Sequence, residues 1–298
     1  MRKPDVVIVG AATRDLNDEA PRGWLLGGGV TYGALALARL GVRTGVLLGL
    51  DDEARTAPEL DLIRDAGAEV VEVSLAKGPV FRNTETLAGR VQTCNGPSDP
   101  VPVAALPERW REARTWVLAP VASEIHDEWA GAPPTDACVA LAWQGVLRHL
   151  EPGVRVRPLE PGPSPLVRRA DILAVSRHDI PGDLPLRSIG QWLPPSAELL
   201  LTAGLLGGLL VRFVGHQLVE ARAYPSVPSP VEVDATGAGD TMLAGLVAAR
   251  VAGGPDGHRL GRDLHLGALA GSLLVEGPGM NSVPTLGQLK ERLAREGD

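Results

Sequence analysis

The sequence is poor in aromatic residues, and it has no long apolar stretch. Phe, Trp and Tyr make up 3% of the 298 residues, although 44% of the residues are hydrophobic. The core must therefore consist mainly of Leu, Val and Ala. No stretch approaches the roughly 20 apolar residues of a membrane span. The N-terminal apolar run, Val6 to Val9, is shorter than the ~7–15 apolar residues of a signal peptide. We expect a cytoplasmic protein with no membrane partner.

Cysteine, paired histidines and excess positive charge are also scarce. Cys94 and Cys138 are the only cysteines, which is too few for a disulfide framework and favours a reducing compartment. The six histidines include no pair at the H-x-x-x-H spacing of a metal site. The net charge of −7, from 29 basic and 36 acidic residues, argues against a nucleic-acid partner. It is still compatible with a local basic pocket for phosphate groups.

Glycine and proline, by contrast, are abundant, with 36 and 26 residues. Between them, short apolar runs typical of buried strands alternate with Ala- and Leu-rich helical stretches. The predicted strands span 5–10, 44–49, 69–75, 117–119, 138–142, 172–175 and 199–202. The predicted helices span 28–40, 59–66, the residues after Thr241, 264–275 with Asp263 as N-cap, and 285–295. This alternation predicts an α/β fold with a mainly parallel sheet, in which ligands bind beyond the carboxyl ends of the strands.

The most informative motif is the glycine-rich run from Val233 to Thr241, VDATGAGDT. Its glycines let bare backbone N–H groups approach a ligand, and the helix predicted after it favours negative charge at its N-terminus. A carboxylate at such an anion site, Asp240, makes sense if it takes a proton from an attacking hydroxyl. From local spacing alone, a strand-to-helix turn whose Asp caps the helix is an equally good interpretation.

The segment 234–240, Asp-Ala-Thr-Gly-Ala-Gly-Asp, resembles the C-terminal signature of the ribokinase/PfkB family of carbohydrate and nucleoside kinases. The resemblance implies that Gly237, Ala238 and Gly239 form the anion hole for the transferring phosphoryl group. It also implies that Asp240 is the catalytic base.

The same resemblance implies a ribokinase-like three-layer α/β/α fold, with residues 1–298 forming a single domain. Family members cover the substrate with a small β lid, to which we assign about 16–26 and 79–94. The second segment alternates β-type and polar residues, as a hairpin or sheet extension does. The resemblance also implies that two chains pair through their lids as a homodimer.

Two N-terminal features resemble the substrate side of the family. Asp15 follows Gly10 closely, as does the family's Asp that holds substrate hydroxyls, and a carboxylate can accept two hydrogen bonds from a vicinal diol. Without the resemblance, Asp15 would be a turn or cap residue. Gly27 and Gly28, before an Ala-rich helix, resemble the glycine pair that approaches a bound sugar.

Two further residues bear on the choice of substrate. Tyr32 stands where the family usually has an Asn that contacts substrate hydroxyls. A phenol offers one O–H and a flat apolar face, so Tyr32 favours a cyclitol or nucleoside over ribose or fructose. Arg90, in the predicted lid, could neutralise phosphate charge with its planar fork, or it could be an ordinary surface arginine.

The predicted nucleotide and metal sites rest on weaker matches to the motifs of the family. Thr202, Gly204 and Gly207 resemble the family's T-x-G-x-x-G turn, which lies against the nucleotide. Asp179 falls at the end of the family's N-x-x-E motif, where Ser176 replaces the Asn. An acid remains, so Asp179 is a candidate to hold Mg²⁺ through water, with a helix cap as the alternative. The glycine turn at 275–279 resembles an element near the family's adenine pocket.

These motifs together predict an enzyme that uses ATP and Mg²⁺ to phosphorylate a hydroxyl of a small polyol, which is a sugar, a cyclitol or a nucleoside. Two alternatives stay open: a kinase of phosphorylated sugars, and a non-catalytic member that binds a metabolite or nucleotide. The departures at Tyr32, Ser176 and Asp179 support the second alternative. A dinucleotide-binding oxidoreductase is disfavoured, because no G-x-G-x-x-G follows the first strand. The motifs do not name the substrate, since loops outside them set specificity.

Overall fold

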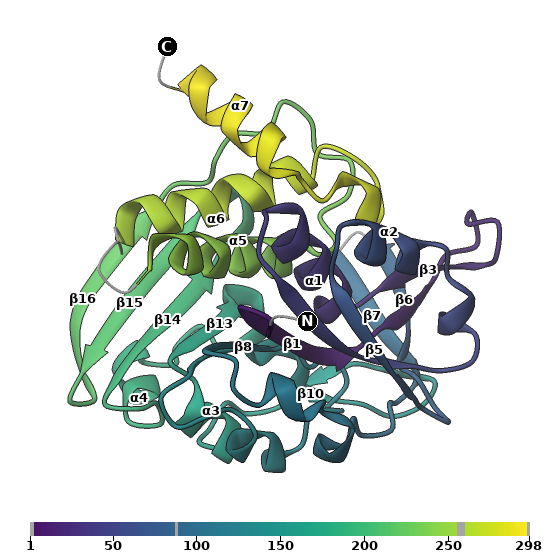
Figure 1. Ribbon diagram of the computed structural model, residues 1–298, viewed down its shortest axis with the longest axis horizontal. Helices are drawn as coiled ribbons and strands as arrows, with labels where there is room; N and C mark the ends of the chain where they lie inside the picture. Colours follow the sequence, from purple (N-terminus) through teal and green to yellow (C-terminus); the bar gives the residue numbers. More distant parts are fainter. Residues whose placement is uncertain (1–2, 87–88, 255–259, 297–298) are drawn as a thin grey trace.

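A nine-stranded sheet with helices on both faces forms the main body of the protein (Figure 1). The computed structural model describes residues 3–86, 89–254 and 260–296. The strand order is β16-β15-β14-β13-β9-β8-β1-β4-β5, and every neighbouring pair from β14 to β5 is parallel. The strands are β1 Val6–Ala11, β4 Thr44–Leu50, β5 Glu69–Ser74, β8 Thr115–Leu118, β9 Cys138–Ala142, β13 Ile172–Ser176, β14 Ser196–Thr202, β15 Gly208–Val214 and β16 Gln217–Tyr224.

The helices form two layers around this sheet. In Figure 1, α1, α5, α6 and α7 lie on one side and α3 and α4 on the other. The helices are α1 Gly29–Arg39, α2 Glu59–Asp65, α3 Pro165–Arg169, α4 Leu186–Gly190, α5 Ala238–Gly253, α6 Leu260–Leu274 and α7 Leu286–Glu296. The three-layer α/β/α fold predicted from the sequence is therefore confirmed.

The central strands are continuous apolar runs in the sequence because both faces of the sheet are buried. Successive side chains of a strand point to opposite faces of the sheet. Val6 and Ile8 of β1 join the core cluster that contains residues of α1 and α5. Val7 and Val9 join the cluster on the opposite face. That second cluster holds four fully buried tryptophans, so most of the tryptophans fill one layer of the core. They are Trp110, Trp116, Trp129 and Trp143.

A second, smaller sheet forms the lid, at the end of the molecule opposite β16 (Figure 1). Its strand order is β11-β7-β6-β2-β3. These strands are β2 Thr13–Leu16, β3 Trp24–Gly27, β6 Val80–Thr86, β7 Gly89–Gly96 and β11 Val154–Arg155. Arg14 of β2 donates hydrogen bonds of 3.0 and 2.8 Å to Asp51, which follows β4. This ion pair ties the lid to the main sheet. Pairing of two chains through the lid stays a prediction.

Two expectations about the elements are wrong. The helix predicted after Thr241 begins at Ala238, because the glycine-rich run turns directly into its first helical turn. Asp263 lies inside the first turn of α6 and is no N-cap, since that helix begins at Leu260. In addition, no ranges were predicted from the sequence for the antiparallel edge strands β15 and β16. Within the residues that the structure describes, no helix combines the length and apolar character needed to span a bilayer.

Candidate active site

The glycine-rich run forms a left-handed turn that opens directly into α5. Gly237 has φ +81° and ψ 2° and is the N-cap of the helix, without a side-chain capping bond. The N–H groups of Gly239 and Asp240 have no backbone acceptor among the described residues, because no carbonyl precedes the first turn of a helix at the right distance. The N–H of Gly239, the N–H of Asp240, which reaches only its own carboxylate, and the positive end of the helix dipole make this turn suited to bind an anion.

Asp234, at the start of the motif, holds this turn in place. Its carboxylate accepts the Thr236 N–H at 2.9 Å and the Gly279 N–H at 3.2 Å. The N–H of Val233 donates to the carbonyl of Val275 at 2.7 Å. The glycine turn at 275–279 is therefore fastened to the anion-binding turn. Sequence reasoning gave Asp234 no role, although an Asp that binds the N–H two residues later is a common turn signal.

Tyr32 of α1 packs against the turn, and its side chain is buried, with an exposed fraction of 3%. A Cβ built on Gly237 would lie only 2.4 Å from the Tyr32 ring, and one on Gly279 would lie 4.0 Å from its hydroxyl. Burial, aided by the negative charge of Asp234, raises the pKa of Tyr32. The flat face that was expected to favour a cyclitol or nucleoside is thus occupied by the Gly237 turn, because glycine lets the ring approach the backbone.

Asp240 lies in the first turn of α5 and faces the glycines at the start of α1. A Cβ built on Gly29 would lie 2.7 Å from the Asp240 Oδ1. Burial raises the pKa of Asp240 to about 6; Arg148 acts in the opposite direction, and the negative charge of Asp179 adds to the increase. Since Gly237 is the N-cap, Asp240 does not cap the helix. A carboxyl group with a pKa near neutrality is well matched to the task of a general base.

Asp15 lies on the other side of the same glycines. A Cβ built on Gly27 would lie 2.4 Å from the Asp15 Oδ2, and the Thr13 hydroxyl donates to Asp15 at 3.0 Å. Gly28, with φ +103°, makes the turn into α1. The three glycines at 27–29 therefore run between the two carboxylates, Asp15 at one end and Asp240 at the other. Gly29 was part of the triple glycine noted in the sequence, but only Gly27 and Gly28 were assigned to the substrate site.

Asp179 follows β13 and is held by a side chain from the 3₁₀ turn Trp143–Val146, which follows the neighbouring strand β9. The Gln144 amide donates to both carboxylate oxygens of Asp179, at 3.0 and 3.1 Å. Ser176 is the N-cap of the short 3₁₀ helix Arg177–Asp179 and accepts the His178 N–H. Asp179 is therefore no helix cap. Within the described part of the chain, no group of three or more His, Cys, Asp or Glu could hold a metal ion.

Two charged residues near the site were missed by sequence reasoning. Glu124 is fully buried, and its carboxylate accepts N–H groups from Ala11, Val121 and Ala122 at 2.8 to 3.1 Å. It thereby joins the loop after β8 to the end of β1. Arg148, which follows the 3₁₀ turn Trp143–Val146, is half-buried. Neither residue belongs to a recognisable motif, so only the fold brings them to the site.

The T-x-G-x-x-G turn lies at the end of β14, next to the end of β16. Gly204 and Gly207 both have positive φ, and a Cβ on Gly207 would lie 2.1 Å from the carbonyl oxygen of Tyr224. Thr202 ends β14 and is half-buried. Glycine is needed at 207 both for its conformation and for this close contact.

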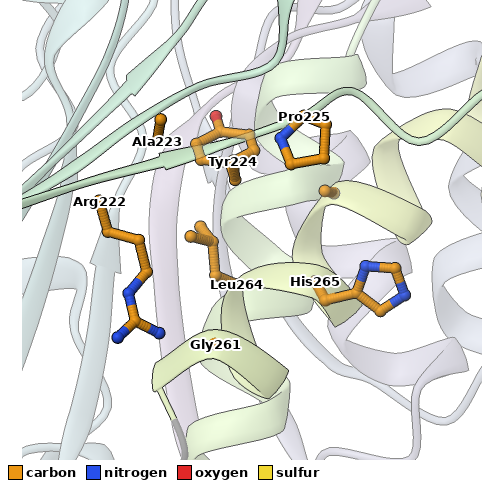
Figure 2. A pocket seen from close by; sticks show the side chains of 8 residues that line it. Arg222, Ala223, Tyr224, Pro225, Gly261, Leu264 and His265 are labelled. Atoms are coloured by element: carbon orange, nitrogen blue, oxygen red, sulfur yellow. The ribbon is translucent and has the colours of Figure 1, made fainter.

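A pocket of about 240 Å³ lies beside this turn, between the end of β16 and α6 (Figure 2). It is lined by Arg222, Ala223, Tyr224, Pro225, Gly261, Leu264, His265 and Ala268. Figure 2 shows Arg222 and Tyr224 extending from β16 and Leu264 and His265 from α6. Arg90 belongs to β7, but its side chain lies outside the described residues, so its predicted contact with substrate is not tested.

Comparison with known proteins confirms the predicted family over part of the chain. Residues 191–286 match the model of the pfkB family of carbohydrate kinases. This segment contains both the T-x-G-x-x-G turn and the glycine-rich run. No curated protein matches the sequence significantly.

Solved structures of similar fold include kinases of the ribokinase family. A pyrophosphate-dependent kinase of that family, complexed with a pyrophosphate analog and myo-inositol, has a TM-score of 0.72 and 19% identity, covering 93% of this chain and 98% of that one. Ribokinase from Arabidopsis thaliana, complexed with ribose and ATP, has a TM-score of 0.68 and 20% identity, covering 98% and 99%. A nucleoside kinase from Methanocaldococcus jannaschii has a TM-score of 0.68 and 15% identity, covering 99% and 100%.

Proposed function

We propose that this chain, whose residues 191–286 match the pfkB family of carbohydrate kinases, transfers a phosphoryl group from ATP to a hydroxyl of a small polyol. One observation carries the proposal. Asp15 and Asp240 lie at opposite ends of the same three glycines, and Asp240 stands beside the open N-terminus of α5. A polyol bound over glycines 27–29 could place one hydroxyl at Asp240 and others at Asp15.

The chemistry assigned to each residue follows from its position. Asp15 accepts hydrogen bonds from neighbouring hydroxyls of the acceptor and so fixes its orientation. Asp240 accepts the proton of the attacking hydroxyl. The N–H groups of Gly239 and Asp240, after the Gly237 turn, stabilise the negative charge of the phosphoryl group during its transfer. Asp234 stabilises the conformation of that turn by hydrogen bonds, and Tyr32 does so by packing against Gly237.

The donor and its metal ion would lie beyond this turn. Mg²⁺ usually keeps several waters and takes one or two carboxylates together with phosphate oxygens. Asp179 fits such a role, because Gln144 occupies only part of the bonding capacity of its two oxygens. When bound, the ion would bridge and neutralise the donor phosphates. The ATP base would lie towards the Thr202–Gly207 turn and the pocket between Tyr224 and α6.

A turnover screen tests the proposal. We would supply ATP or pyrophosphate with Mg²⁺ and assay phosphorylation of myo-inositol, ribose, fructose and several nucleosides. Pyrophosphate is included because a solved structure of similar fold is a pyrophosphate-dependent kinase. Turnover of at least one polyol supports the assignment. Donor binding without turnover of any acceptor would favour a non-catalytic binding protein instead.

The pKa of Asp240 leads to a pH prediction. The deprotonated carboxylate is the form that can accept a proton, and its pKa is raised to about 6. We therefore expect kcat/KM for the acceptor, which reports the pKa of the free enzyme, to increase about tenfold per pH unit below 6 and to level off above about 7, as expected for one essential base. The measurement is kcat/KM from pH 4.5 to 8.5 with the donor saturating. A flat profile between pH 5 and 7, with chemistry limiting, would contradict the role of Asp240.

Asp15→Ala is expected to act on acceptor binding. The variant loses hydrogen bonds between a charged group and the acceptor, each of which contributes about 1.5–3 kcal/mol. The apparent KM for the polyol should therefore increase at least tenfold, while KM for the donor stays within about threefold. Asp18→Ala is the matched control, because Asp18 is an exposed lid residue paired only with Arg82. An unchanged acceptor KM in Asp15→Ala would remove Asp15 from the substrate site.

A further inference from the structure

Arg148 is a half-buried arginine whose hydrogen-bonding capacity is almost unused. A guanidinium carries five N–H donors, yet its only hydrogen bond among the described residues is a long one, 3.4 Å from Nη1 to the carbonyl of Val121. No carboxylate of the described chain lies within ion-pair distance of it. Arg212, for comparison, bonds Glu220 at 3.0 Å. A partly buried cation without a partner is costly, so Arg148 is suited to receive an anion from outside the chain.

The position of Arg148 connects the lid to the active site. Its guanidinium carbon lies 5.8 Å from the centre of the Phe81 ring. Phe81 of β6 is in register with Asp15 of β2, and paired residues of neighbouring strands share one face of a sheet. Arg148 therefore lies over the face of the lid that carries Asp15.

Arg148 is also linked to the residues assigned to base and metal. The 3₁₀ turn immediately before it carries Gln144, which bonds Asp179. Burial lowers the pKa of Arg148, and the charges of Asp179, Asp240 and Asp15 oppose that decrease. The charge of Arg148 is thus coupled to three carboxylates that are assigned to the acceptor, base and metal sites, between which a transferring phosphoryl group must pass.

We propose that Arg148 binds the phosphoryl group as it passes from the donor to the acceptor hydroxyl. This inference rests on the proposed kinase function. Phosphorus forms a bond to the acceptor oxygen while the bond between phosphorus and the donor oxygen breaks. The hydroxyl proton goes to Asp240. Arg148 offers paired N–H donors to phosphoryl oxygens. It also offsets the repulsion that the surrounding carboxylates would exert on an incoming phosphate.

Kinetics of Arg148 variants test this assignment. We expect Arg148→Gln to lower kcat by about 10²–10³-fold or more, in the range of other arginines that stabilise phosphoryl transfer, with acceptor KM within about threefold. Arg148→Lys should recover part of the activity, because it keeps the charge but not the fork. Guanidinium ion added to Arg148→Gly should increase kcat, which a merely structural role would not produce. Arg212→Gln is the matched control and should keep normal kinetics.

A binding measurement separates this inference from the proposed function. Calorimetric titration with Mg²⁺-pyrophosphate, as a phosphoryl probe, should show at least tenfold weaker binding to Arg148→Gln than to the unmodified chain, even if no acceptor is turned over. Equal pyrophosphate binding and equal kcat in the two proteins would overturn the assignment. A variant that loses only the affinity for phosphorylated acceptors would also overturn it, since Arg148 would then bind the acceptor.

Discussion

Asp240→Asn should lower kcat by about 10²–10⁴-fold, the usual contribution of a general base. The amide has nearly the same shape as the carboxylate but cannot accept the hydroxyl proton. Binding of the donor should change much less, because the N–H groups of the turn belong to the backbone. The measurements are kcat and donor affinity, compared with those of Asp61→Asn, which alters an exposed residue in the first turn of α2.

The stability of Asp240→Asn should move in the opposite direction to its activity. A carboxyl group whose pKa is raised on folding destabilises the folded protein at any pH where it is ionised. The cost is absent below the unfolded pKa, near 4, and is fully present above about 6. At pH 7 we therefore expect the thermal midpoint of Asp240→Asn to equal or exceed that of the unmodified chain, as often occurs at active sites. Near-normal kcat in this well-folded variant would end the assignment of Asp240.

The sequence predicted best those elements whose pattern is local. The strand run at Val6 and the helix of Ala and Leu after Gly28 appear within a residue or two of their expected bounds. In both segments, burial on all sides leaves an apolar signature that needs no knowledge of the rest of the fold. The glycine-rich run before Thr241 was also informative, because a left-handed turn with close contacts restricts the residue to glycine.

The elements that were missed depend on contacts between distant segments. The edge strand β16 is largely exposed and alternates weakly, so hydrophobicity does not mark it. Arg148 and Glu124 look like ordinary charged residues, and only the packing of the loop after β8 and the turn after β9 brings them to the site. Tyr32 illustrates another limit of prediction from the sequence. Its residue type suggested an open aromatic face, whereas a turn more than 200 residues later covers that face.

Two glycines of the same motif should respond to alanine in opposite ways. Gly237 has φ +81°, and a Cβ there would lie 2.4 Å from the Tyr32 ring. Gly237→Ala should therefore lose stability, because left-handed backbone costs alanine about 1 kcal/mol or more and the ring must also move. Gly239 lies inside α5, and a Cβ there meets nothing within 4 Å. Gly239→Ala should keep or raise the thermal midpoint, since alanine is favoured over glycine in a helix by about 1 kcal/mol.

Activity should nevertheless fall in both variants, and for different reasons. In Gly239→Ala the new methyl group should hinder the approach of the phosphoryl group to the N–H groups at the start of α5. We expect kcat to fall on the order of 10²-fold, as for loss of an oxyanion contact. In Gly237→Ala the turn itself is displaced. Adding Tyr32→Leu to Gly237→Ala should restore part of the lost stability. The smaller side chain relieves the clash with the new methyl group, while the strain of the left-handed backbone remains. Thermal midpoints and kcat of the three variants separate these effects. If Gly239→Ala folds and turns over substrate normally, the turn at 237–239 does not bind the phosphoryl group.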